Sequence, residues 1–310
     1  MEALGGTFIE PYNPRISDML LTVFTPTFNR AHLLSRTFQS LASQSFKDFE
    51  WLIVDDGSTD DTEAVVTSFQ AKCDFPIHYI KKENGGKHTA HNHALIRAKG
   101  DFFFTVDSDD WLPEDGLTHV ADACVGIAAD KEVMGLIALK QFPDGRIIGN
   151  TYPWTGTLKT LRELELSGNG GERSLVFKTS MLRNYPFPVI KGEKFMVEGV
   201  VYNGFVDSKK FLVSNDTFTI CEYQDNGLSS NPRHLMGRNP GCYKLYYRNR
   251  IDMAASFKER VGYVIRYNAF SKLYRGDQVG PYRGRHMLLK ALLWPLTPFV
   301  ARMYSKGNAK

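Results

Sequence analysis

The chain has 310 residues, of which 43% are hydrophobic and 23% are charged, as is typical of a soluble globular protein with one large domain or one domain and an appendage. The four cysteines form no C-x-x-C pair, which argues against a disulfide scaffold or a structural zinc site and suits a reducing cytoplasm. No segment of 18 or more uncharged apolar residues occurs, and residues 1–18 lack the features of a signal peptide, so no bilayer-spanning helix is expected.

The net charge of +4 is divided unevenly along the chain. Residues 231–310 contain 16 Lys and Arg and 3 Asp and Glu, whereas residues 1–230 contain 22 and 31. A C-terminal part this basic is expected to meet an anionic partner, and the two candidates are nucleic acid and an anionic membrane surface.

Apolar runs alternate with segments of helical spacing over the first 110 residues, and this predicts strands that alternate with helices. The strands are expected at 19–24, 49–54, 77–80 and 102–106, and the helices at 31–43, 63–70 and about 87–98. Residues 25–27 are expected to end the first strand. The alternation predicts an α/β fold with a mostly parallel central sheet flanked by helices.

The second half has a mixed pattern of short strands, loops and short helices, and beyond Gly227 the chain becomes helical and basic. The short strands are expected at 135–139, 174–177, 210–213 and 218–222. The chain has no G-x-G-x-x-G after its first strand and no G-x-x-x-x-G-K-[ST], which disfavours a dinucleotide-binding dehydrogenase and a P-loop ATPase.

An acidic cluster follows the aromatic strand at 102–106, where the sequence reads Asp107, Ser108, Asp109, Asp110. Carboxylates this close repel one another, so they usually need a cation, and the expected one is hard, Mg²⁺ or Mn²⁺, with phosphates. The carboxyl ends of parallel strands are also where α/β folds bind ligands. An exposed acidic turn anchored by Trp111 is the alternative.

Three strand-end segments resemble family 2 glycosyltransferases of the GT-A fold, in particular bacterial envelope-polysaccharide members. They read V-F-T-P-T-F-N-R, V-D-D-G-S-T-D and D-S-D-D, in the same order and spacing as in the family, and the resemblance covers roughly residues 19–225. It implies an N-terminal lead at 1–18, a GT-A domain at 19–227 (nucleotide-sugar half 19–112, acceptor half 113–227) and a helical basic region at 228–310.

The resemblance implies that the first loop and the D-D-G-S turn hold the nucleotide base and ribose. The residues there are Thr25, Pro26, Asp55 and Asp56. Carboxylates suit this role because they accept hydrogen bonds from a uracil N–H or ribose hydroxyls. Helix capping is the alternative for Asp55 and Asp56, although Asp60 and Asp61 lie closer to the start of the next helix.

In the family the D-x-D motif binds the metal, which implies that Asp109 is a metal ligand here. Asp107 is expected nearer the ribose, or to reach the metal through water, and Asp110 is expected only to cap the turn before Pro113. The Mn²⁺ or Mg²⁺ ion would bridge the diphosphate and stabilise the charge on the leaving nucleoside diphosphate.

A fourth segment, residues 84–93, also matches a family position. Gly86 and Lys87 are expected at a helix N-terminus, which suits a phosphate. The family often has an Arg where this chain has His91, and Lys87 is expected to supply that charge; a solvated surface lysine is the alternative. His88 and His91 share a helical face, but no third strong ligand lies nearby in sequence, so zinc is disfavoured.

An inverting transfer needs a base opposite the leaving group, and the family supplies an Asp or Glu that begins a helix. Glu198 is expected to be this base, because it opens a predicted helix whose dipole would hold the carboxylate charged. A first-turn acid without catalytic role is the alternative, and Glu193 and Asp207 are weaker choices. Residues 170–173 are expected at the acceptor cleft, and 222–229 near the diphosphate or in a lid.

Basic and aromatic residues interleave from 243 to 273, a pattern typical of nucleic-acid surfaces and also of amphipathic helices. Residues 286–296 are apolar and contain Trp294, but they are too short and too interrupted by proline to span a bilayer. They suit a helix that lies in a membrane interface, with nearby basic side chains on lipid phosphates. These are Arg283, Arg285, Lys290 and Arg302. Packing on the catalytic domain or in a dimer is the alternative.

These patterns predict a metal-dependent, inverting glycosyltransferase that moves a sugar from a UDP-sugar to a glycan or lipid-linked acceptor at the inner face of the cell membrane. A nucleotidyltransferase shares the sheet and the metal, but residues 25–30 lack its glycine-rich loop. A nucleic-acid-binding protein would leave the acidic strand ends without a purpose, so no nucleic acid is expected. A catalytically inactive sugar-nucleotide binder and a homo-oligomer stay open.

Overall fold

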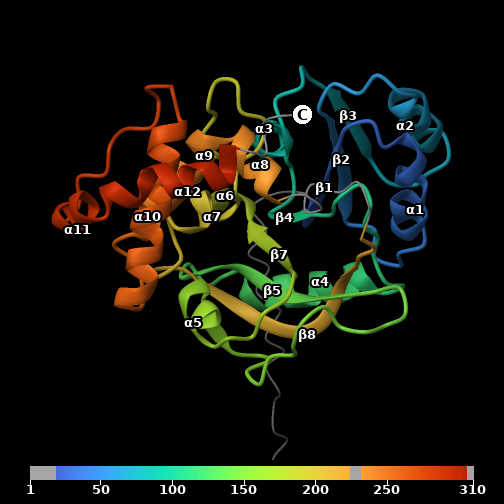
Figure 1. Ribbon diagram of the computed structural model, residues 1–310. Coiled ribbons are helices and arrows are strands. Elements are labelled where there is room, and N and C mark those ends of the chain that lie inside the picture. The colour runs from blue at the N-terminus through green and yellow to red at the C-terminus, as the bar shows by residue number, and fades with distance from the viewer. Residues whose placement is uncertain (1–18, 224–231, 306–310) are drawn as a thin grey trace, which may run out of the picture.

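The computed structural model describes residues 19–223 and 232–305, so the N-terminal lead and the domain boundary expected at residue 227 lie outside the described residues. A central eight-stranded sheet in this described part has the order β3-β2-β1-β4-β7-β5-β8-β6 (Figure 1). Its strands are β1 (Leu21–Thr27), β2 (Phe49–Asp55), β3 (Ile77–Lys81), β4 (Phe102–Thr105), β5 (Val133–Gln141), β6 (Leu158–Thr160), β7 (Arg173–Lys178) and β8 (Lys210–Ile220).

The first four strands are parallel, as expected for strands that alternate with helices. Their connections are α1 (Ala31–Ala42), α2 (Thr62–Gln70) and α3 (Lys87–Arg97), and α4 (Gly116–Ile127) follows β4. The strand β7 runs antiparallel to its neighbours β4 and β5, and β6 runs antiparallel to β8. The expected α/β fold with a mostly parallel sheet is confirmed.

The sheet separates two hydrophobic cores, because successive side chains of a strand point to opposite faces. In β4, Phe103 belongs to the core that contains Ala90 and Ala94 of α3. Its neighbours Phe102 and Phe104 belong to the other core, which also holds apolar residues of α1, α2 and α4. Both faces of the parallel strands are therefore covered, which explains why these strands read as continuous apolar runs.

The strand β1 does not end at residue 24 as expected but continues through Thr27 and pairs with β2 along its whole length. Pro26 is tolerated inside β1 because β1 pairs with β4 only as far as Phe24. The carbonyl of Phe24 points toward β4, and the carbonyl of Thr27 points toward β2. Because these directions alternate along a strand, the nitrogen of Pro26 points to the β4 side, beyond the last residue of β4, and no hydrogen bond of the sheet is lost there. The strands expected at 210–213 and 218–222 are likewise one strand, β8, with bulges against β5.

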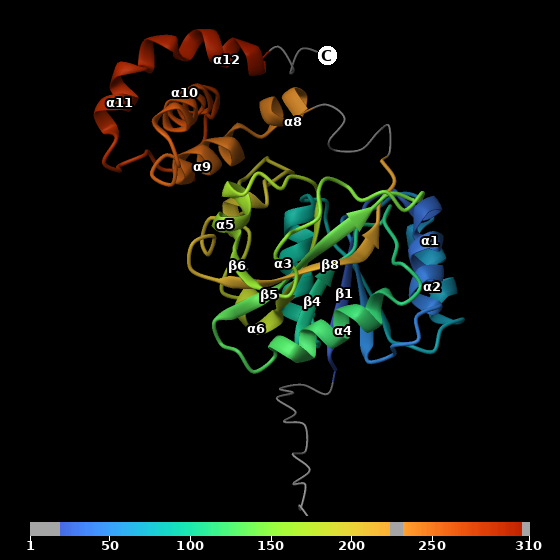
Figure 2. The same ribbon diagram turned by 90° about the horizontal axis from the view of Figure 1, so that it is seen from below.

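Residues 113–223 contain three short helices, and a helical layer follows them in the chain. The short helices are α5 (Leu161–Leu166), α6 (Thr179–Leu182) and α7 (Gly199–Tyr202), and the layer comprises α8 (Pro232–Arg238), α9 (Pro240–Arg250), α10 (Phe257–Leu273), α11 (Met287–Leu292), the 3₁₀ helix η2 (Trp294–Leu296) and α12 (Thr297–Ser305). In Figure 2, α9 and α10 lie between the sheet domain and the outer helices α11 and α12. None of the described helices is long and apolar enough to cross a bilayer.

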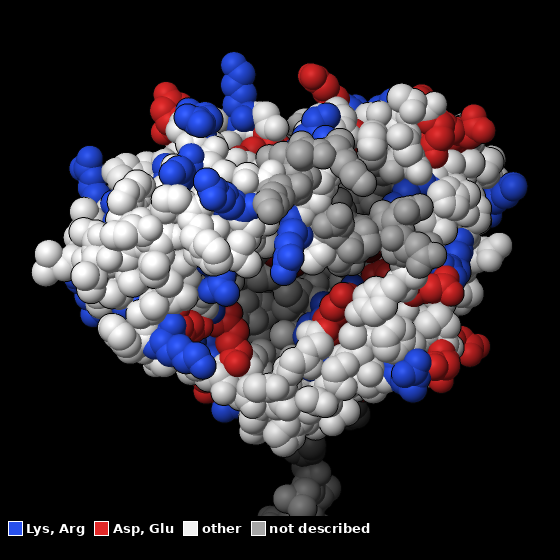
Figure 3. All heavy atoms as spheres, in the orientation of Figure 1, with Lys and Arg blue, Asp and Glu red and all other residues white. Residues whose placement is uncertain are grey.

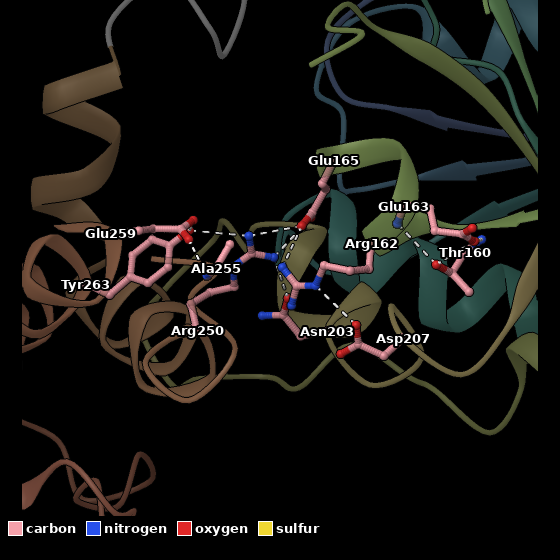
Figure 4. A network of polar contacts seen from close by, with 10 residues as sticks. All are labelled: Thr160, Arg162, Glu163, Glu165, Asn203, Asp207, Arg250, Ala255, Glu259 and Tyr263. Atoms are coloured by element: carbon pink, nitrogen blue, oxygen red, sulfur yellow. Dashed lines mark hydrogen bonds and ion pairs between the residues drawn. The ribbon is translucent and has the colours of Figure 1, made fainter. Parts of the chain in front are cut away.

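Buried Arg250 of α9 joins this helical layer to α5 and to the end of α7 (Figure 4). Its guanidinium makes a two-pronged contact with Glu165 of α5, at 3.0 and 3.1 Å. It also donates to Asn203, next to α7, and to the hydroxyl of Tyr263 in α10, both at 3.3 Å. One side chain thus holds three helices together, and the C-terminal helices pack as part of the folded body.

Arg250→Met is expected to destabilise the protein by about 2–3 kcal/mol, because it leaves the Asn203 oxygen without its partner and Glu165 with Arg162 alone. This lies at the low end for a broken buried pair, since Glu165 is partly exposed. Denaturant unfolding would measure the loss. Arg248→Met on the same helix is the matched control and should change stability by less than about 0.5 kcal/mol. Equal stability of the two variants would contradict the anchoring role of Arg250.

Candidate active site

The loops after β1 and β2 are bound to each other at the carboxyl edge of the sheet. The backbone nitrogen of Asn29 donates to the Ser58 hydroxyl, and its side-chain oxygen accepts from the Thr59 backbone nitrogen, both at 2.8 Å. Asn29 has a positive φ of 52°, a backbone conformation that asparagine tolerates better than most residues. The first two motifs therefore form one unit beside the end of β4.

The two carboxylates of the D-D-G-S turn shape the neighbouring loops. Asp55 is buried and accepts hydrogen bonds from the Ser58 backbone at 2.8 Å and the Tyr79 hydroxyl at 2.6 Å. Asp56 is buried and accepts from the backbone nitrogens of Gly85 and Gly86, at 2.9 and 2.6 Å. Asp56 thus connects the end of β2 to the glycine turn before α3. Contact of Asp55 and Asp56 with a nucleotide stays a prediction.

Neither Asp55 nor Asp56 caps α2. Asp60 accepts from the backbone nitrogens of Thr62, at 3.2 Å, and of Ala31, at 3.0 Å, so it serves the first turns of both α2 and α1. Asp61 precedes α2 without a side-chain capping bond.

The expected nucleotide contacts at the end of β1 are restricted by burial. Thr25 is fully buried, and its hydroxyl accepts a hydrogen bond from the Trp51 indole at 2.9 Å. Pro26 is also buried. The Thr25 side chain is therefore occupied in the core, and only the backbone of this strand end is left to meet a nucleotide.

Each of the three carboxylates after β4 has its own cation from a different element. Asp107 pairs with Lys87 at the start of α3, with 2.8 Å between the Lys87 Nζ and the carboxylate oxygen. Asp109 pairs with Arg30 from the loop after β1, and Asp110 pairs with Lys140 of β5 at 3.0 Å. These cations offset the mutual repulsion of the cluster. Lys140 belonged to no motif, and Arg30, which ends the first motif, was assigned no role, since only the fold brings these two cations here.

The pKa values in this cluster move in opposite directions. Burial disfavours the carboxylate form of Asp107, but Lys87, Lys140 and Arg30 outweigh that effect, so the pKa of Asp107 is lowered. Burial raises the pKa of Asp110 in spite of Lys140, and the charge of Asp107 adds to this rise. Asp107 is thus held as an anion at the edge of the site.

Asp110 makes contacts inside the fold and does not face solvent. Its side chain accepts from Lys140 and from the Cys221 thiol, at 3.0 and 3.1 Å, and its backbone oxygen accepts from Thr37 of α1 at 2.8 Å. The adjacent Trp111 exchanges backbone hydrogen bonds with Ile220 of β8. An exposed acidic turn does not describe this cluster, because Asp110 is buried and joins α1, β5 and the end of β8.

Asp107 and Asp109 are the oxygen donors that a hard cation would meet here. No group of three possible ligands among His, Cys, Asp and Glu occurs in residues 19–223 and 232–305. Mg²⁺ is commonly bound in proteins by one or two carboxylates together with substrate phosphates and water. Two carboxylates at the mouth of the site fit an ion that arrives with a diphosphate.

The glycine turn before α3 places Lys87. Gly86 has φ 96°, and a Cβ there would lie 2.0 Å from the Lys194 carbonyl oxygen, so no other residue fits without a shift. The Lys87 Nζ lies 3.8 Å from a carboxylate oxygen of Glu198 as well as beside Asp107. Burial lowers the pKa of Lys87, but the two carboxylates raise it by more than burial lowers it, so the net shift of the pKa is upward. Lys87 is an ion-paired site residue and not a free surface lysine.

His88 and His91 face the core. The His91 ring packs edge-on against Phe24, Phe103 and Phe187, with centroid distances of 5.0–5.8 Å. Burial and nearby Lys87 lower the pKa of His91 to about 3, so it is neutral at pH 7. The described residues place no third ligand beside these rings. His91 supplies no positive charge to the site, and the nearby cation is Lys87.

Glu198 lies at the start of α7, but the expected helix is only the four residues Gly199–Tyr202. A single turn has little dipole, so the argument from the helix dipole was wrong. The charged neighbour of Glu198 is Lys87, and about half of the Glu198 side chain is exposed. Of the weaker choices, Asp207 pairs with Arg162 at 3.1 Å, and Glu193 accepts from the backbone nitrogens of Gly241 and Cys242, at 2.5 and 2.7 Å.

The first turn of α9 holds the segment that carries Glu198. Besides the contacts of Glu193, the Asn239 side chain accepts from the backbone nitrogens of Lys194 and Phe195, both at 3.2 Å. The Cys242 sulfur accepts from the Val197 nitrogen at 3.2 Å. The C-terminal helices therefore support the segment that carries Glu198, a role that the sequence did not predict.

The two other segments expected near the site are residues 170–173 and 222–229. Arg173 donates to the carbonyls of Ile148 and Asn150 and to the Tyr152 hydroxyl, at 2.7–2.8 Å, which holds the 170–173 loop in place. Of residues 222–229, only the first two lie in the described part, where Glu222 pairs with Arg36 at 2.7 Å. Figure 3 shows a hollow near the centre of the molecular face, with acidic and basic side chains along its margin.

Known proteins resemble this chain in sequence and in fold. Residues 22–137 match the family described as Glycosyl transferase family 2. The chain is 40% identical over 174 residues to the GalNAc(5)-diNAcBac-PP-undecaprenol beta-1,3-glucosyltransferase of Campylobacter jejuni. This alignment covers 54% of this chain and 54% of the relative. The chain is also 34% identical over 105 residues to the poly(ribitol-phosphate) beta-N-acetylglucosaminyltransferase TarS of Staphylococcus aureus. This second alignment covers 33% of this chain and 18% of TarS.

The fold of TarS extends over most of this chain. Its crystal structure superposes with a TM-score of 0.57 at 17% identity and covers 93% of this chain and 55% of TarS. The structure of TarS residues 1–349 with UDP-GlcNAc superposes with a TM-score of 0.55 at 18% identity. The superposition covers 93% of this chain and 89% of that structure. The chain spans about half or less of the length of these curated relatives. The strand-end motifs and the sheet agree with the match of residues 22–137 to glycosyltransferase family 2, and the chain has a GT-A fold.

Proposed function

We propose that the chain transfers a sugar from a nucleotide sugar, a UDP-sugar, to a hydroxyl of a glycan or lipid-linked acceptor in bacterial envelope-polysaccharide synthesis. The observation that carries this proposal is the position of Lys87 between Asp107 at the end of β4 and Glu198 at the start of α7. One side chain joins the expected donor and acceptor sides. The names of the C. jejuni and S. aureus relatives, and TarS with UDP-GlcNAc, support this class of donor and product.

On the donor side, the loops after β1 and β2 would hold the nucleotide, and Asp109 with Asp107 would hold Mn²⁺ or Mg²⁺. When bound, this ion neutralises charge that develops on the leaving diphosphate. Arg30 and Lys87 lie beside the same carboxylates and offer positive charge to the phosphates. Lys87 is at the N-terminus of α3, where backbone N–H groups also favour an anion.

On the acceptor side, Glu198 would take the proton from the acceptor hydroxyl. The acceptor oxygen then bonds to the anomeric carbon while the bond from that carbon to the diphosphate oxygen breaks. The electron pair of the broken bond leaves with the nucleoside diphosphate. Because the base stands opposite the leaving group, the configuration at the anomeric carbon inverts. Half-exposed Glu198 has the solvent access that an incoming hydroxyl needs.

For the location we propose the cytoplasmic face of the cell membrane, with a lipid-linked acceptor. The net charge of residues 231–310 is strongly positive and suits an anionic membrane surface. The C. jejuni relative is named for an undecaprenol-linked acceptor, which supports the same class of acceptor here.

A thermal-shift screen tests the donor. UDP-, GDP-, CMP- and dTDP-sugars would each be added with and without Mn²⁺. At a hundred times its dissociation constant, the bound donor adds about 2.7 kcal/mol, which raises Tm by a few degrees in a chain of this size. A UDP-sugar with Mn²⁺ is expected to give the largest rise. If no nucleotide raises Tm, the proposed function is wrong.

A further inference from the structure

Seven large apolar side chains are exposed within 17 residues of α11, η2 and α12. They are Met287, Leu288, Leu292, Trp294, Leu296, Phe299 and Met303, which we call the outer apolar face. The other exposed large apolar side chains of the described residues number eight and are spread between Phe28 and Phe257. Single exposed apolar residues are ordinary, but a contiguous group marks a surface that binds something.

The same helices have a separate inner side that packs on the protein. Thr297 and Ala301 of α12 are buried, and the Tyr304 ring lies 4.7 Å from that of Phe270 in α10. The outer side points away, with Leu288 87% exposed and Phe299 74% exposed. The helices are therefore fixed to the body by one side, and the outer apolar face is left to an external partner.

The charge around this face selects the partner. Residues 278–305 contain no Asp or Glu, and four basic residues lie among or next to the apolar ones. These are Arg283, Arg285, Lys290 and Arg302. A second copy of the chain across a two-fold axis would place these cations against their equivalents, which is unfavourable. An anionic bilayer offers phosphates to the cations and acyl chains to the apolar side chains.

We propose that the outer apolar face inserts into the headgroup and acyl boundary of an anionic lipid bilayer. This deepens the proposed function and rests on its membrane location. Figure 2 shows α11 and α12 on the outside of the helical layer, with α9 beneath them. Since α9 holds the segment that carries Glu198, the helical layer lies between the bound bilayer and that segment.

The test uses the full chain and vesicles without any nucleotide. Vesicles with phosphatidylglycerol are compared with vesicles of phosphatidylcholine alone, by co-sedimentation and by Trp294 emission. Because the chain has three other tryptophans, the Trp294 emission is the difference between the unaltered chain and a Trp294→Phe variant. The triple variant Leu288→Asp, Leu292→Asp, Phe299→Asp is expected to bind at least tenfold more weakly to the anionic vesicles. The matched control is Ile96→Asp with Val125→Asp, two exposed apolar residues of the GT-A domain, and it should bind like the unaltered chain.

The outcomes separate the alternatives. Binding to anionic vesicles with a blue shift of Trp294 emission, both lost in the triple variant, supports the proposal. Absence of binding to anionic vesicles overturns it, and so does equal loss in the control. A concentration-dependent dimer that only the triple variant abolishes, without vesicle binding, would assign the face to a second copy. Because no donor is present, failure here leaves the nucleotide screen as an independent test of the proposed function.

Discussion

Glu198→Gln is expected to lower the rate of sugar transfer about a thousandfold, within the range for loss of a positioned general base. The amide has nearly the same shape as the carboxylate but cannot take the acceptor proton. Nucleotide binding should change little, because the residues proposed to hold the nucleotide and the ion lie on other loops and about half of the Glu198 side chain is exposed. Single-turnover rates at saturating donor, with nucleotide affinity measured in parallel, would check both expectations.

Asp207→Asn is the matched control for this experiment. Asp207 follows Glu198 on the same segment, but its carboxylate pairs with Arg162 and not with Lys87. Its substitution should change the transfer rate by less than about threefold. A Glu198→Gln protein that keeps more than a tenth of the unaltered rate would remove Glu198 as the base. A large loss in Asp207→Asn alone would transfer the role to that residue.

Much of the donor half could be predicted because its signals are local. A strand of apolar residues that ends in Asp or Gly, followed by helical spacing, fixes both the element and the position of its last residue. The three strand-end loops are brought together by the parallel pairing of β1, β2 and β4. Asp107 and Asp109 lie at the end of β4 for this reason, and the expected fold class is confirmed.

The partners of these carboxylates could not be predicted in the same way. Arg30 and Asp109 are 79 positions apart, and Lys140 pairs with Asp110 from a strand on the other half of the sheet. No periodicity connects such residues, since only tertiary packing decides which cation meets which anion. The support that α9 gives to the Glu198 segment has the same cause, because its hydrogen bonds join residues 44–49 positions apart.

Local rules also failed where tertiary context overrode them. Proline normally ends an internal strand, but at Pro26 the neighbouring β4 has already ended. The helix expected after Glu198 is a single turn, and its apolar residues Val200, Val201 and Phe205 are buried from that turn and from the loop that follows it. In both places the backbone differs from the local expectation, because a local pattern does not determine which element brings a side chain inside.

Asp109→Asn is expected to weaken binding of Mn²⁺ in the presence of UDP at least tenfold and to lower transfer by a hundredfold or more, about 2.7 kcal/mol of transition-state stabilisation. The substitution removes the charge of one of only two carboxylates placed to meet the ion, while Arg30 keeps an oxygen partner in the amide. Electron paramagnetic resonance of free Mn²⁺ measures the binding without any reaction. Asp115→Asn, an exposed carboxylate at the start of α4 that makes no capping bond, is the control and should bind Mn²⁺ normally. Because Asp109 faces the mouth of the site and Asp110 faces the core, a normal affinity in Asp109→Asn would mean that the ion, if the reaction uses one, is held by Asp107 and phosphates without the second carboxylate.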